Sequence, residues 1–276
     1  MIIFEIKRFL KNRNTYISLL VGIILVLLQL IYKLISQNEM LRLLNQNYDK
    51  FKNDYYPLSV FNTYIGIDGG SVFTNILYTL FPLLIAIPYA SSYAKDLKTG
   101  YIKTLLQKTN RKSYYISKYI TMFLSGFIIT LIILSASLIL TSMFIPSIQP
   151  NLITANFPLI NKNQLWFELY YSHPYIYLIF YILIDAFYYG VLSTTALTFS
   201  LFYGNPFIST LIPSIIYIFL QYIFGLFELN KFSPYLFLRA DQPICADLNI
   251  IIAEFLVLLI VNSLIFIIRG IKKDVF

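Results

Sequence analysis

Few residues of this sequence have side chains that could carry out catalysis or hold a metal ion. The chain has one cysteine, Cys245, which cannot form an internal disulfide, and one histidine, His173. A closed Cys/His metal site needs about four such ligands, so these two residues cannot build one. The sequence also lacks the GxxxxGK[ST], GxSxG and HExxH motifs. We therefore expect this chain to bind no metal or cofactor of its own and to have no nucleotide-hydrolysing motif.

Two carboxylates stand inside apolar stretches, where a charge is unfavourable. Asp185 lies about ten residues into one such stretch, and Glu254 lies about four residues into another. A carboxylate near the centre of a membrane costs roughly 2.5–3.5 kcal/mol, so it faces the protein interior or a water-filled cavity. Asp185 and Glu254 are thus candidates for a transport path or a proton relay. Alternatively, Asp185 holds helices together through hydrogen bonds. The candidate partners for those bonds are Asn262, Gln221 and Thr194.

The composition indicates a chain that spans a membrane. Of the 276 residues, 58% are hydrophobic and 12% are charged, whereas a soluble domain has about 25% charged residues. A membrane-spanning helix needs about 20 mostly apolar residues. We therefore predict an all-α polytopic integral membrane protein in which residues 1–276 form a single transmembrane domain with six transmembrane helices. The predicted spans are Thr15–Ile35, Val72–Ala94, Tyr119–Ile145, Tyr175–Tyr203, Phe207–Phe227 and Ile250–Ile268.

The basic residues are distributed unevenly between the two sides that six spans create. Lysine and arginine gather in the cytoplasmic segments of membrane proteins. If the N-terminus is cytoplasmic, 14 of the 21 basic residues lie on that side, and the other side is near neutral. We therefore expect a plasma-membrane protein with both termini and residues 95–118 in the cytoplasm. The net charge of +8 then reflects topology, and no nucleic-acid partner is expected. The 14 residues are Lys7, Arg8, Lys11, Arg13, Lys95, Lys98, Lys103, Lys108, Arg111, Lys112, Lys118, Arg269, Lys272 and Lys273.

The segments at the cytoplasmic side carry their own helical patterns. In residues 1–14, apolar side chains such as Ile2 and Phe9 fall on one side, and Glu5 and Arg8 fall on the other. This pattern predicts an amphipathic interfacial helix lying on the lipid bilayer, with a solvated basic segment as the alternative. Residues 95–118 predict a short helix with an apolar edge, which suits docking to another protein. The alternative is a basic loop that lies on anionic lipid.

Residues 95–118 resemble the inner loop of type-2 ABC exporter permeases. In that family an acidic residue is followed by a glycine, paired leucines in a helical stretch, a basic turn and a lysine that opens the next span. The six spans, the inner termini and the amphipathic start are similar too. The chain departs from the pattern at Asp96, where glutamate is more usual, at Tyr101, where threonine is frequent, and at Thr109-Asn110, where proline is common. The matching residues are Asp96, Gly100, Leu105, Leu106, Arg111 and Lys118.

The resemblance implies a permease subunit that pairs with a second permease chain, as a homodimer or a heterodimer. It also implies a separate cytoplasmic ABC ATPase subunit, which would use ATP and Mg²⁺, so this chain itself would not be an enzyme. A coupling helix including Tyr101, Ile102, Leu105 and Leu106 would enter a groove of that ATPase. The short outer loops are similar to those of exporters of drugs and antimicrobial peptides, so the implied substrate is a drug, an antimicrobial peptide or another amphipathic molecule.

Two other functions stay open. An ion-coupled secondary transporter would use Asp185 and Glu254 as its relay, although such proteins are expected to contain internal repeats, and we find no convincing repeat here. An integral membrane enzyme is a further alternative, but it would need a cluster of histidines, cysteines or paired carboxylates near one face. The sequence leaves open the substrate, the ATPase and the choice between homodimer and heterodimer. Export over import rests on the resemblance and on the small outer loops.

Overall fold

The computed structural model describes residues 1–46, 57–151 and 160–272, and all regular secondary structure in these residues is helical. Within them, five helices are long and apolar enough to cross a membrane, as a multi-pass α-helical membrane protein requires. The C-terminal one is continuous through a π-helical turn, η2 (Ile265–Arg269). The five are α2 (Arg13–Gln46), α8 (Arg111–Phe144), α10 (Pro174–Tyr203), α11 (Pro206–Leu226), and α13 (Leu248–Leu264) with η2 and α14 (Gly270–Lys272).

The second predicted span, Val72–Ala94, is not one continuous helix. The helix α5 (Val72–Ala86) has 15 residues, about 22 Å at 1.5 Å per residue. A turn over residues 87–91 then separates it from α6 (Ser92–Lys98). Pro88 lies in this turn, where it has no N–H to continue a helix, whereas Pro82 is accommodated within α5. The described residues thus contain five helices of membrane-spanning length and one shorter apolar helix instead of six equal spans.

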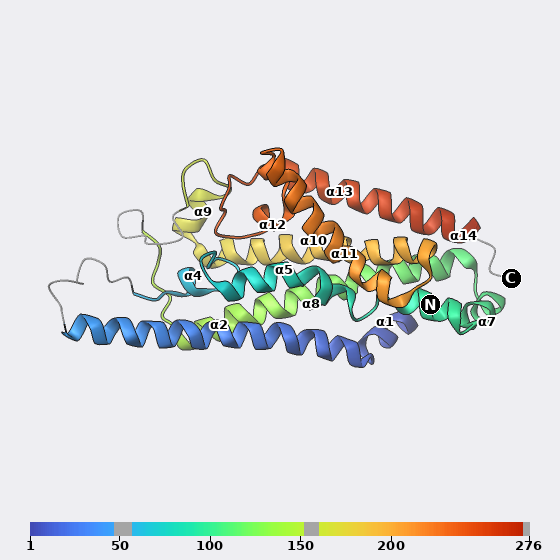
Figure 1. Cartoon of the computed structure of the whole chain (residues 1–276), viewed down its shortest axis with the longest axis horizontal. Coiled ribbons are helices and arrows are strands. Elements are labelled where there is room, and N and C mark those ends of the chain that lie inside the picture. Colours follow the sequence, from blue (N-terminus) through green and yellow to red (C-terminus); the bar gives the residue numbers. More distant parts are fainter. Residues whose placement is uncertain (47–56, 152–159, 273–276) are drawn as a thin grey trace.

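The long helices run side by side and divide the molecule into two ends (Figure 1). The N-terminus, α14 and α7 lie at one end, which we call the termini end, and α4 and α9 lie at the other, which we call the far end. The remaining helices are short. They are α1 (Ile2–Leu10), α4 (Val60–Thr63), α7 (Tyr101–Lys108), α9 (Phe167–Ser172), η1 (Asn230–Phe232) and α12 (Pro234–Phe237).

The helix α10 lies at the centre of the bundle and packs most extensively on α8. The two backbones approach closely at Gly126 of α8, where a Cβ atom would lie 2.8 Å from the carbonyl oxygen of Tyr189 and 2.9 Å from Ser193 Oγ. Ser193 Oγ in turn donates to the carbonyl of Met122 at 2.8 Å. Small residues at such a crossing are typical of membrane helix pairs, because association there depends on close packing.

Large aromatic side chains fill much of the interior. The outside of the bundle exposes aliphatic and aromatic side chains and carries no charge along much of its length. The bulkiest fully buried side chains are all tyrosines, among them Tyr78, Tyr114 and Tyr189. The long helices α2, α11 and α13 expose large apolar residues, including Ile31 and Phe219. Apolar surface spread over several helices is what a lipid-facing exterior requires.

A substitution at the close approach between α8 and α10 tests this packing. We expect Gly126→Ala to lower the stability of the purified protein by about 1–3 kcal/mol, because the added Cβ would overpack a backbone contact. Gly225→Ala is the matched control, because a Cβ there meets nothing within 4 Å. Thermal unfolding in detergent measures both variants. Equal unfolding temperatures for Gly126→Ala and wild type would contradict the close crossing.

Candidate functional site

The segment predicted to couple to a partner is arranged as helix, turn and helix at the termini end. Gly100 has φ +69° and ψ 2°, a left-handed conformation that glycine adopts without strain, and it precedes α7. After α7, the side chain of Asn110 accepts a hydrogen bond from the backbone N–H of Lys112 at 3.0 Å and so caps α8. The short helix α7 therefore lies between α6 and α8. The left-handed conformation of Gly100 precedes α7, and the side-chain cap of Asn110 begins α8.

The apolar edge of α7 lies partly against the protein itself. Ile102, which we expected on the docking edge, is 1% exposed and belongs to the core. Tyr101, Leu105 and Leu106 are half-buried, and both leucines pack on the same core. Ile102 thus anchors α7 to the core, while the two leucines keep part of their surface exposed. Arg111, after the turn, is half-buried and donates to the carbonyl of Ile271 at 3.4 Å.

Asp96 and Lys118, two residues of the predicted motif, belong to a buried cluster of four charges. Arg8 donates to both carboxylate oxygens of Asp96, at 2.7 and 3.1 Å. Lys118 Nζ lies 2.8 Å from Asp96 Oδ2 and 3.1 Å from Glu5 Oε2. The side chains of Glu5 and Lys118 are 0% exposed and that of Asp96 is 1% exposed. The cluster has no net charge, and it fastens α1, α6 and α8 to one another.

Two tyrosines complete the surroundings of this charge cluster. Tyr114 donates to Asp96 Oδ2 at 3.0 Å, and Tyr89 donates to Glu5 Oε2. Lys118 Nζ also lies 4.9 Å from the centroid of the Tyr89 ring and 5.7 Å from that of Tyr114. Aromatic faces attract such cations when water is excluded. Each of the four charges is thus paired with an opposite charge, and both carboxylates accept hydrogen bonds, which are the conditions under which burial is tolerated.

The electrostatic setting of Asp96 follows from these contacts. Burial raises the pKa of this carboxyl, but the hydrogen bonds and positive charges of Arg8 and Lys118 outweigh burial and hold its pKa below the usual value. Burial lowers the pKa of the Arg8 guanidinium, and the pairing with Asp96 outweighs that effect, so the pKa is raised. Both residues therefore stay charged at neutral pH. The stability contributed by Asp96 is present above its unfolded pKa and is lost as the pH falls through its folded pKa.

The sequence indicated half of this cluster. It singled out Asp96 and Lys118, but it assigned Glu5 and Arg8 to the solvated side of the first helix. In the structure Glu5 is fully buried, and Ile3 of the same helix is 72% exposed. The signal in the sequence was Glu5 itself, because it is the single acidic residue in a basic segment.

Asp185 lies in the middle of α10 and is 1% exposed. Tyr78 of α5 donates to its Oδ2 at 3.0 Å, and Oδ1 has no hydrogen-bond partner among the described residues. None of the candidate partners forms this bond. Thr194 Oγ1 donates to the carbonyl of Val191, and Asn262 Nδ2 donates to that of Leu258, each within its own helix. Tyr78 was missed because tyrosines are abundant in this sequence and none stood out.

Glu254 is half-buried on α13, where Tyr188 of α10 donates to its Oε2 at 3.2 Å. Tyr189, the next residue of α10, faces a different neighbour, with its hydroxyl 2.9 Å from that of Tyr217. Asp185 and Glu254 thus have different tyrosine partners on different helices.

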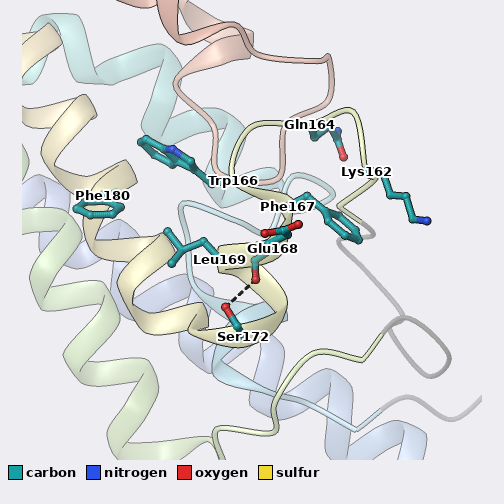
Figure 2. A pocket seen from close by; sticks show the side chains of 8 residues that line it. All are labelled: Lys162, Gln164, Trp166, Phe167, Glu168, Leu169, Ser172 and Phe180. Atoms are coloured by element: carbon teal, nitrogen blue, oxygen red, sulfur yellow. Dashed lines mark hydrogen bonds between the residues drawn. The ribbon is translucent and has the colours of Figure 1, made fainter.

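At the far end, a pocket of about 820 Å³ opens beside α9 (Figure 2). Its mouth carries polar side chains, including Lys162 and Glu168, and its inner wall carries Trp166 and Phe180, whose ring centroids are 5.3 Å apart. Trp166 and Phe180 also line a second cavity of about 350 Å³ between α10 and α13, whose other walls include Phe187 and Leu248. The two spaces share these rings, so a polar opening adjoins an apolar groove.

A second buried polar group ties α2 to the chain around α4 and α5. Lys33 Nζ lies 2.7 Å from Asp68 Oδ2, and Gln29 donates to the same oxygen at 2.9 Å. Burial raises the pKa of Asp68, although Lys33 acts to lower it. Next to Asp68, the pair Arg239–Asp241 packs on Gly69, where any Cβ would overlap both side chains. These contacts are structural ties at the far end.

No protein-family model, curated protein or solved structure matches this chain. Within residues 1–46, 57–151 and 160–272, no group of three or more His, Cys, Asp or Glu side chains could hold a metal ion. The features available for function are therefore the α7 helix with its charge cluster, the buried Asp185 and the cavities of the bundle.

The pairing within the charge cluster leads to a prediction about the stability of the protein. We expect Asp96→Asn to lower the free energy of unfolding by about 3–5 kcal/mol, because it leaves the fully buried Lys118 without sufficient negative charge and weakens the pairing with the half-exposed Arg8. Wild type should also lose stability as the pH falls below about 4, near the usual aspartate pKa, and the variant should lose less. Thermal unfolding in detergent across a pH series measures both effects.

The control for this prediction is Glu39→Gln. Glu39 is exposed on α2 and has no ion-pair partner in the described part of the chain. Its neutralisation should leave stability within about 0.5 kcal/mol of wild type. An Asp96→Asn protein that unfolds together with the Glu39→Gln control would contradict the proposed importance of the cluster.

Proposed function

We propose that this chain is the membrane-spanning permease subunit of an ATP-binding cassette exporter. The observation that carries the proposal is the placement of α7. This short amphipathic helix lies at the same end as the N-terminus and α14, and it is held between α6 and α8. A coupling element has to transmit force between a soluble ATPase and the membrane helices, so it needs a rigid connection to those helices.

The buried charge cluster supplies such a connection. It joins α6, on one side of α7, directly to α8, on the other side, through Asp96 and Lys118. Ile102 adds an apolar anchor from α7 itself. A displacement of α7 would therefore be passed to α8, which packs along the central helix α10. Because packed interfaces are not continuously deformable, a shift at the loop favours a discrete rearrangement of the helices.

The distribution of charge supports an orientation in the plasma membrane in which the termini end faces the cytoplasm. Residues 1–14, residues 95–118 and residues 269–273 contain 14 of the 21 lysines and arginines, which agrees with the positive-inside rule. The exposed parts of Leu105 and Leu106 would then face a cytoplasmic ABC ATPase, which would bind ATP and Mg²⁺. A second permease chain, identical or similar, would complete the transporter.

The cavities at the far end favour an amphipathic substrate. A polar opening next to the apolar groove between α10 and α13 suits a molecule with a polar head and an apolar body. Drugs and antimicrobial peptides have this character. The shared rings of Trp166 and Phe180 would contact the boundary between the two parts of such a molecule.

The decisive test is the association of the permease with an ABC ATPase subunit that carries a Walker motif. We expect Leu105→Ala/Leu106→Ala to weaken association by about 1.5–3 kcal/mol, roughly 10- to 100-fold, because each half-buried leucine has about half of its 1.5–3 kcal/mol left to contribute. The measurements are co-purification of the ATPase and stimulation of its ATP hydrolysis, at matched membrane expression.

The matched control is Thr104→Ala/Gln107→Ala. Thr104 and Gln107 are exposed on the same helix, so this variant shortens two side chains of α7 without touching its apolar edge. It should keep association within about threefold of wild type, because exposed polar side chains contribute little to docking. Full ATPase recovery by the double leucine variant, with unchanged unfolding temperature, would remove α7 as the main contact.

One observation favours a second candidate, an ion-coupled secondary transporter. Asp185 is buried, and its Oδ1 atom has no hydrogen-bond partner among the residues that the structure describes. Such a carboxylate inside a membrane is a candidate for proton or cation binding. In this reading, transport would respond to an ion gradient in the absence of ATP.

Asp185→Asn distinguishes a transport role from a structural one. An asparagine keeps an oxygen that can accept from Tyr78 but cannot exchange a proton. If Asp185 acts in transport, we expect the variant to keep its unfolding temperature and ATPase association while transport or its pH dependence changes. Tyr78→Phe removes this hydrogen bond but leaves the carboxylate of Asp185 in place, and it therefore serves as the matched structural control. Unchanged transport by Asp185→Asn at normal expression would remove this residue from the functional set.

A further inference from the structure

A basic pocket of about 580 Å³ lies at the termini end, between α1 and the turn that joins α5 to α6. The end of α1 is fixed to this turn, because Asn12 Nδ2 donates to the carbonyl of Pro88 at 2.5 Å. The pocket therefore lies between two segments, α1 and the turn after α5, that this hydrogen bond holds together. Among the residues that line it are Phe4, Lys7, Arg8, Lys11, Ser92 and Lys95.

The pocket has an uncompensated positive charge. Arg8 is neutralised by the charge cluster, since the two acids Glu5 and Asp96 balance Arg8 and Lys118. Lys7, Lys11 and Lys95 are exposed and form no ion pair with any described residue. Three positive charges thus converge on one opening, which favours an anionic ligand.

A buried hydroxyl gives a second, independent indication of a ligand. Ser92 is 6% exposed and lines the pocket, and its Oγ atom has no hydrogen-bond partner within the described residues. A buried hydroxyl without a partner is unfavourable. A phosphate oxygen in the pocket could accept this hydrogen bond together with charge-assisted bonds from the lysines.

The surroundings of the pocket indicate where the phosphate comes from. The side chains of Ile3, Phe4 and Leu10 on α1 are 72%, 50% and 47% exposed. Phe4 also lines the pocket. Exposed apolar side chains on a short helix at the end of a membrane bundle suit contact with acyl chains. The basic pocket and the apolar surface thus lie side by side, as the headgroup and the acyl chains of an anionic phospholipid would require.

We propose that this pocket binds the phosphate headgroup of an anionic phospholipid. Lys7, Lys11, Lys95 and Ser92 donate to the phosphate, and the acyl chains lie along Phe4 and its apolar neighbours on α1. This site is separate from α7 and from the cavities at the far end, and it does not depend on the proposed transport function. The bound lipid would join α1 to the start of α6, close to the charge cluster.

The full-length protein, purified in detergent with phosphatidylglycerol or with phosphatidylcholine, tests the proposal by native mass spectrometry of retained lipid. Detergent removes the field of a charged membrane surface, so that retention reports a specific site. We expect retention of phosphatidylglycerol over phosphatidylcholine. Lys7→Gln/Lys11→Gln/Lys95→Gln should reduce that retention at least about tenfold, since a charge-assisted hydrogen bond contributes on the order of tenfold in affinity.

The matched control removes three other exposed lysines, by Lys98→Gln/Lys112→Gln/Lys272→Gln. It lowers the net charge equally and should keep retention within about twofold of wild type, because solvated lysines outside the pocket contribute little to a bound headgroup. Unfolding temperatures confirm that both variants are folded. A photo-crosslinking amino acid at Phe4 should label phosphatidylglycerol in reconstituted vesicles, and the pocket variant should lose this label.

Three results would overturn the proposal. The first is equal retention of phosphatidylglycerol by wild type and the pocket variant. The second is an equal loss in the control variant, which would make the effect one of overall charge. The third is displacement of the lipid by inorganic phosphate at equal concentration, which would make the pocket a site for free phosphate instead of a lipid headgroup.

Discussion

The buried pairing of Glu5, Arg8, Asp96 and Lys118 determines how the termini end is assembled. Glu5, Asp96 and Lys118 would each be strongly unfavourable alone in this interior, and all four charges have opposite charges within 4 Å. An apolar cluster of similar volume could be as stable, but it would tolerate sliding of the helices. The two hydrogen bonds from Arg8 to Asp96 tolerate little sliding, because both must keep their geometry. The charges therefore fix the relative positions of α1, α6 and α8. The position of α7 follows, because it is connected to α6 on one side and to α8 on the other.

Tyrosines have a related role deeper in the bundle. A tyrosine fills space like phenylalanine but requires a partner for its hydroxyl when water is absent. Tyr78 meets Asp185, Tyr188 meets Glu254, and Tyr189 meets Tyr217. Each contact joins two different helices, and all three involve the central helix α10. The interior is thus specified by hydroxyl contacts in addition to the shape of its rings.

The sequence predicted the long apolar helices well, because their period and length depend on local composition. It did not predict the interruption after α5, because one proline was not enough to choose between a kink and a turn; the structure has a turn around Pro88 and none at Pro82. For the candidate site, the residue types were recognised but their partners were not. Arg8 and Asp96 are 88 positions apart, and no periodicity relates residues on different helices. The sequence related the exposed lysines of the basic pocket to topology and, for Lys95, to a loop on anionic lipid, because convergence on one opening is a property of the folded chain.

The separation between Arg8 and Asp96 has a consequence for the synthesis of the protein. The first helix leaves the ribosome before its buried partners exist, and Lys118 follows later than Asp96. At about 5–20 residues per second, the wait for these partners is roughly 5–20 seconds. During that interval α1 can rest on the membrane by its exposed side chains Ile3, Phe4 and Leu10, with Glu5 in water. The charge cluster then closes only after the start of α8 is made, so α1 is synthesised before its buried partners and takes its final position only after they follow.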